Sequence, residues 1–62
     1  MSQESRDLAK KAQKHLKQAK EYSKEAKEIF KKIGDKDGEK IATETEKKAE
    51  EGEAHVDKQM GG

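Results

Sequence analysis

The chain has 62 residues and a formal net charge of +1, and 47% of its residues are Asp, Glu, Lys or Arg. It contains no cysteine, which excludes disulfides, thiolate metal sites and cysteine nucleophiles. A chain this short forms at most one small domain with a modest core. Its composition lies between that of a disordered polyampholyte and that of a charged helical bundle, so the pattern of residues has to decide between them.

Residues 3–33 are predicted to form one amphipathic helix. From Leu8 the chain can be written as four heptads, LAKKAQK, HLKQAKE, YSKEAKE and IFKKIGD. The first, second and fifth places of each heptad fall on one side of a helix, and here they hold mostly apolar residues. Ser2 or Ser5 can cap the N-terminus, and Gly34 suits the left-handed position that ends a helix.

A second, weaker helix is predicted over about residues 37–59, after a turn at 34–38. The heptad pattern resumes as IATETEK, KAEEGEA and HVDKQMG. Thr45, Lys48 and Gly52 stand at places of the apolar stripe, and a glycine within a helix costs about 1 kcal/mol relative to alanine. We therefore expect this helix to fray after Gly52.

Charge divides the two halves of the chain. Residues 1–33 carry ten Lys or Arg against five Asp or Glu, and residues 34–62 carry five against nine, so the halves are +5 and −4. An antiparallel pairing places the lysines of residues 8–20 beside the acids of residues 50–57. This charge pattern favours an antiparallel pair over a parallel one.

The predicted fold is therefore an all-α antiparallel two-helix hairpin, a single domain over residues 1–59 with a flexible tail at 60–62. With the turn near residue 36, the numbers of facing residues add up to about 72, and Gly52 then faces Tyr22. Such a thin seam suggests dimerisation into a four-helix bundle, or docking on a partner. Eight large side chains are predicted to form the intramolecular seam and, in an oligomer, the contact face: Leu8, Leu16, Tyr22, Ile29, Phe30, Ile33, Ile41 and Val56.

The connection between the helices has some features of a calcium-binding loop. Asp35, Asp37, Glu39 and Glu46 fall at places 1, 3, 5 and 12 of an EF-hand loop, but Lys40 stands where that loop needs glycine. We interpret the segment as an interhelical turn.

Two histidines, His15 and His55, occupy stripe places that can face each other near the open end of the hairpin. Such a pair could bind a metal or sense pH, but histidines at the edge of a helix pair without a role are far commoner. No metal or cofactor is predicted.

A lysine face on the first helix suggests nucleic acid as an alternative partner, because phosphate neutralisation by lysine needs no motif. Against it stand the single arginine, the single tyrosine and the acids of the second half. We interpret these lysines as a solvated face and keep nucleic acid as an alternative partner. The lysines that could face phosphate are Lys10, Lys14, Lys17, Lys20 and Lys24.

The run from Tyr22 to Ala42 resembles the junction between tetratricopeptide repeats, in which EIxKxIGDxxGExxA joins helix B of one repeat to helix A of the next. The resemblance covers about 21 of the 62 residues, and it implies a helical hairpin. It departs from the repeat at Glu46, Lys47 and Glu50, where large apolar residues are expected. A peptide-binding groove therefore does not carry over, since repeat stacks also need about three copies.

No Ser/His/Asp arrangement or HExxH motif is present, and two helices alone enclose no ligand-sized concavity, so we expect no enzyme activity and no small-molecule substrate. No apolar run approaches a membrane span, and a cytoplasmic location is the default expectation. The predicted function is a non-catalytic interaction or structural module, with a second copy or another helical protein as partner. The alternatives are an engineered or repeat-derived hairpin without a natural ligand, an RNA-binding dimer, and a disordered, stress-protectant-like polyampholyte.

Overall fold

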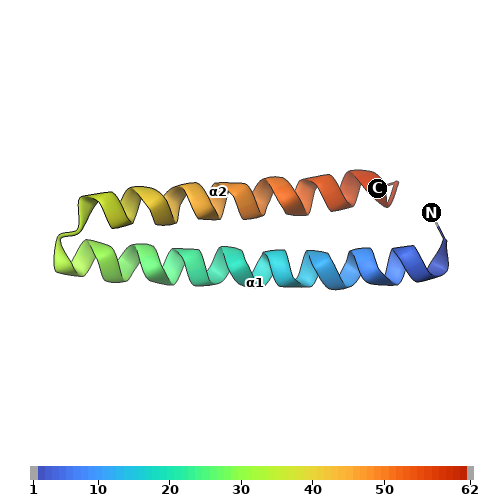
Figure 1. Ribbon diagram of the computed structural model, residues 1–62, viewed down its shortest axis with the longest axis horizontal. Helices are drawn as coiled ribbons and strands as arrows, with labels where there is room; N and C mark the ends of the chain where they lie inside the picture. Colours follow the sequence, from blue (N-terminus) through green and yellow to red (C-terminus); the bar gives the residue numbers. More distant parts are fainter. Residues whose placement is uncertain (1, 62) are drawn as a thin grey trace.

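The computed structural model describes residues 2–61, which form two α-helices joined by a short turn. α1 spans Gln3–Ile33 and α2 spans Lys36–Gln59. The helices run antiparallel and side by side, and the start of α1 and the end of α2 lie at the end opposite the turn (Figure 1). The molecule is a rod of 47 × 14 × 13 Å, which confirms the predicted all-α hairpin. Met1 of the predicted domain and Gly62 of the predicted tail lie outside the described residues.

The ends of α1 follow the capping signals. The Ser2 hydroxyl accepts a hydrogen bond from the backbone N–H of Ser5 at 3.1 Å, which satisfies one of the free donors of the first turn. At the other end Gly34 has φ 75°, a left-handed conformation that suits glycine. The Asp35 N–H donates to the Phe30 carbonyl at 2.9 Å, and this bond closes the helix.

The chain reverses direction within Gly34 and Asp35. The Asp35 carboxylate accepts a hydrogen bond from the Gly38 N–H at 2.9 Å and so caps α2. α2 begins at Lys36, so Gly38 belongs to its first turn and not to the connection. The helix then continues through Gly52 to Gln59.

Small residues line the centre of the helix pair. Ala42 and Ala49 are 5% exposed and Ser23 is 7% exposed, and Gly38 is also buried. Among the described residues no large side chain is fully buried. The two helices alone thus cover only a narrow stripe of each other.

Two glycines fix how the helices pair. A Cβ on Gly38 would lie 2.4 to 2.8 Å from ring atoms of Phe30, and a Cβ on Gly52 would lie 2.9 Å from Leu16 Cδ1. Both pairs have numbers that add up to 68, so the predicted pairing near 72 is wrong, and Gly52 makes room for Leu16 rather than for Tyr22. The physical reason is the tight turn, which reverses the chain nearly two residues earlier than expected.

The predicted intramolecular seam holds for only part of its eight residues. Leu16, Phe30 and Val56 are half-buried between the helices. The other five are exposed, so their assignment to the seam within one chain is wrong. The centre of the stripe runs through the second place of each heptad, and first-place residues are turned about 100° away from it. The exposed five are Leu8, Tyr22, Ile29, Ile33 and Ile41.

Candidate functional site

The candidate site is an uncovered apolar side of the hairpin. Five large apolar side chains have most of their surface in solvent: Leu8 is 60%, Tyr22 67%, Ile29 59%, Ile33 69% and Ile41 63% exposed. Single exposed apolar residues are ordinary on any protein, but several gathered on one side indicate a binding surface. Their placement around the helices therefore decides what they mean.

All five fall on the same side of the helix pair. Leu8, Tyr22 and Ile29 each precede a residue at the centre of the α1 stripe, and Ile41 precedes the buried Ala42 of α2. Seen from one end of an antiparallel pair, the chain runs clockwise around one helix and counterclockwise around the other. The residue before a facing position therefore points to the same side on both helices. Ile33, three residues after Phe30, is turned toward that side as well. We call these five residues the apolar side.

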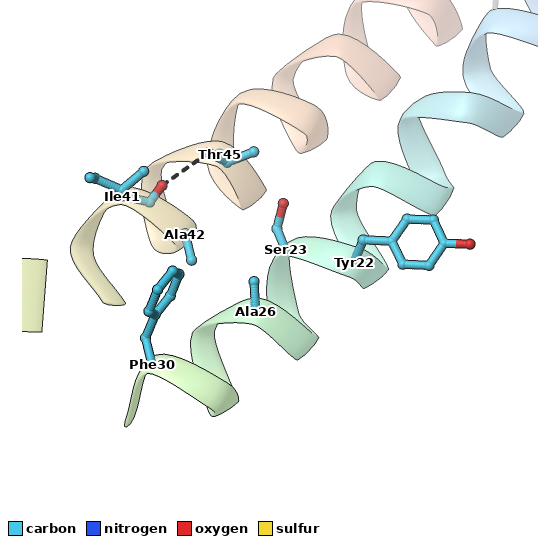
Figure 2. A pocket seen from close by; sticks show the side chains of 7 residues that line it. All are labelled: Tyr22, Ser23, Ala26, Phe30, Ile41, Ala42 and Thr45. Carbon is cyan, nitrogen blue, oxygen red and sulfur yellow. Dashed lines mark hydrogen bonds between the residues drawn. The ribbon is translucent and has the colours of Figure 1, made fainter. Parts of the chain in front are cut away.

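A groove runs along the apolar side near the turn. Figure 2 shows Ser23, Ala26, Phe30 and Ala42 directed into the space between the helices, while Tyr22 and Ile41 point outward on opposite flanks. Together with Thr45 they line an open hollow of about 260 Å³. By comparison, an apolar cavity of about 150 Å³ accommodates benzene. The groove can therefore accept a bulky apolar side chain.

The Ser23 and Thr45 hydroxyl groups in this groove donate to their own helices. The Ser23 hydroxyl donates to the Ala19 carbonyl at 2.8 Å. The Thr45 hydroxyl donates to the Ile41 carbonyl at 3.0 Å, the bond drawn as a dashed line in Figure 2. Because these two donors already have partners, covering Ser23 and Thr45 with apolar groups leaves neither of their hydroxyl protons unbonded.

The opposite side of the hairpin is charged. The residues that follow the stripe centre on α1 are lysines, and the matching places on α2 hold Thr43, Glu50 and Asp57. Lys20 Nζ lies 3.6 Å from Glu50 Oε1, and the Gln13 amide donates to the Asp57 carboxylate. Both contacts join α1 to α2, which agrees with the expected pairing of a basic segment with an acidic one.

The five lysines considered for phosphate binding do not form an isolated basic face. Lys20 is engaged with Glu50. Lys14 and Lys17 line a shallow surface hollow together with Glu21 and Tyr22, and Lys10 and Lys24 are exposed. The neighbouring carboxylates reduce the positive potential that attracts a nucleic-acid backbone.

The remaining candidate groups are spread along the rod. His15 and His55 are both exposed, and no cluster of three or more His, Asp or Glu able to hold a metal occurs within residues 2–61. Asp35 caps α2, and Asp37, Glu39 and Glu46 lie on that helix, so the EF-hand spacing falls on helical backbone. Neither α1 nor α2 is long and apolar enough to cross a membrane.

Comparison with known proteins gives no relative: no family model, no curated protein and no solved structure matches the chain. The resemblance of residues 22–42 to a tetratricopeptide-repeat junction stays a prediction. Function has to be inferred from the surface itself.

Sequence reasoning placed the apolar residues on one broad stripe but did not divide it. The stripe consists of a covered centre and an exposed flank, and the small residues Ser23, Ala26 and Ala42 of the centre form the floor of the groove. A signal for this division was present, because the second heptad place holds alanine or serine in two of the four heptads of α1. Small residues at the centre let the two helices approach and leave larger neighbours outside.

Proposed function

We propose that the protein is a non-catalytic helical-hairpin module that contacts other proteins through its apolar side. The observation that carries the proposal is the separation of the two sides: the large exposed apolar residues gather on one, and cross-helix polar contacts occupy the other. The apolar side offers hydrophobic area and a groove, while the charged side keeps the rod in water.

The shape of the groove supports a protein partner over a small molecule. The hollow is open along the rod, and its lining supplies no cluster of charged or polar groups to orient a small ligand. An amphipathic helix laid along such a groove would insert side chains at intervals of three and four residues, which is a recurring mode of recognition between helices.

Site-specific photo-crosslinking tests this proposal. A benzophenone side chain at position 22 lies on the apolar side, and the same group at position 24 lies on exposed α1 surface on the charged side. We expect position 22 to form adducts with protein in the cells that make the chain, whether with a second copy or with another protein, and position 24 to form few. Equal adduct formation from both positions would contradict the proposal.

A stability measurement checks that the apolar side is not needed for the fold. Tyr22→Lys should change the free energy of unfolding of the dilute protein by less than about 0.5 kcal/mol, as for other surface substitutions. Leu16→Ala should lose about 2 kcal/mol, because Leu16 packs against Gly52. If Tyr22→Lys is as destabilising as Leu16→Ala, the apolar side serves the fold and not binding.

A further inference from the structure

The inference that follows rests on the proposed function and names the partner. We propose that the apolar side is covered by a second copy of the chain, with both turns at the same end and α1 of each copy lying on α2 of the other. The product is a four-helix bundle in which two grooves face each other across a twofold axis parallel to the helices.

The exposed area agrees with one buried face per chain. The hairpin exposes 4949 Å², whereas a compact monomer of 7.0 kDa is expected to expose about 4,000 Å². The excess of about 900 Å² is close to the area of about 800 Å² that each partner buries in a stable complex. Pairing two apolar sides would therefore bring each chain to the exposure of an ordinary folded protein.

Charge selects between the two ways of stacking the helices. α1 carries ten Lys or Arg and five Asp or Glu, and α2 carries five and eight, which gives net charges of +5 and −3. With the turns together, α1 of one copy lies over α2 of the other, so opposite charges flank the interface. With the turns apart, α1 lies over α1 and α2 over α2, and like charges meet.

The apolar residues favour the same arrangement. Ile29, Ile33 and Ile41 lie near the turn, whereas Leu8 is the one large exposed apolar side chain recorded near the open end of the rod. Joining the turn ends places the richest part of one apolar side on the richest part of the other. Reversing one copy would set these isoleucines against the open end of the other rod, where Leu8 is the one large exposed apolar side chain recorded.

The pairing of the helices predicts which side chains interlock. Facing numbers add up to 68 for the two glycine contacts and to 70 for the two polar contacts, so Ile41 is level with residues 27–29 of α1. A twofold axis parallel to the helices leaves heights unchanged. Ile41 of the second copy therefore packs beside Ile29, near the small Ala26, and the symmetric contact forms on the other α1.

Sedimentation tests the partner. The wild-type chain should sediment as a dimer of about twice 7.0 kDa, and Ile41→Lys should weaken dimerisation at least about hundredfold, because each dimer buries this side chain twice. Thr43→Lys is the matched control: it adds the same charge to an exposed place on the same helix, on the opposite side, and should leave the dimer intact. A wild-type chain that is monomeric at every concentration from micromolar to millimolar overturns the proposal. So does a Thr43→Lys variant whose dimerisation is weakened as much as that of Ile41→Lys.

Spin labels test the arrangement. The chain has no cysteine, so Lys36→Cys gives one label site per copy, at the turn and outside the apolar side. With the turns together the two labels should lie within about 30 Å, given helix axes about 10 Å apart and the reach of two labels. A distance approaching the 47 Å length of the rod means the turns are apart and overturns the arrangement.

The experiments distinguish a failure of the dimer from a failure of the proposed module. A monomeric chain that still forms adducts with another protein from position 22 refutes the second copy as partner and leaves the module. A Tyr22→Lys variant that unfolds when dilute refutes the module itself.

Discussion

The contact between Gly38 and Phe30 gives a prediction whose sign opposes helix propensity. Gly38 lies in the first turn of α2, where replacement of glycine by alanine is expected to stabilise the helix by up to about 1 kcal/mol. The new Cβ, however, would lie 2.4 to 2.8 Å from three atoms of the Phe30 ring. Relieving such a clash by moving an aromatic ring or a helix costs about 1 to 3 kcal/mol. Gly38→Ala should therefore lower the free energy of unfolding by about 1 kcal/mol.

Urea denaturation followed by circular dichroism at 222 nm measures this change, and a second background isolates its cause. With Phe30→Leu already present the ring is gone, so Gly38→Ala should become neutral or stabilising by up to about 1 kcal/mol. Gly52→Ala is a milder comparison, because its Cβ would meet the flexible end of Leu16 at 2.9 to 3.0 Å, and its effect should be near zero. A Gly38→Ala variant that is more stable than the wild type would show that Phe30 does not pack on this glycine.

Three further predictions concern the turn and the charged side. Asp35→Ala should cost about 1 kcal/mol by removing the α2 cap, whereas Asp37→Ala, whose side chain has no capping role, should cost less; equal losses in urea denaturation would contradict the capping assignment. Gly34→Ala should cost about 1 kcal/mol through its φ of 75° alone, since nothing lies within 4 Å of the new Cβ; an unchanged midpoint of thermal unfolding would argue against a left-handed residue here. Lys20→Gln should change stability by less than about 0.5 kcal/mol in low or high salt, because the ion pair with Glu50 is partly exposed; a loss above 1 kcal/mol would show that the pair matters more than its exposure allows.

Much of the fold could be predicted because its signals are local. The limits of α1 follow from Ser2, from four heptads in register and from Gly34, and each of these acts within one helical turn. The start of α2 at Lys36 is within one residue of the predicted start, but Gly38 looks like a second turn glycine in the sequence. Its actual role, making room for Phe30 from the other helix, depends on tertiary contact.

The division of the apolar residues could not be predicted for a similar reason. A period of 3.6 residues identifies a stripe but not the line along which the second helix touches it. That line runs through the second heptad places, so the first-place residue Tyr22 lies on the exposed flank, and Leu16 instead lies over Gly52. Ile29, Ile33 and Ile41 are likewise exposed and lie outside the intramolecular seam. The candidate site thus consists of residues that the sequence marks as apolar and that only the structure marks as exposed.

The central claim is that a second copy covers the apolar side, and the accessibility of Tyr22 tests it most directly. Tyr22 is the single tyrosine of a chain without tryptophan, so its fluorescence reports on this side alone, and it is 67% exposed in one hairpin. Quenching by acrylamide should decrease as the protein concentration rises from micromolar to millimolar, and Ile41→Lys should abolish the decrease. Quenching that stays constant over that range in the wild type would contradict the claim.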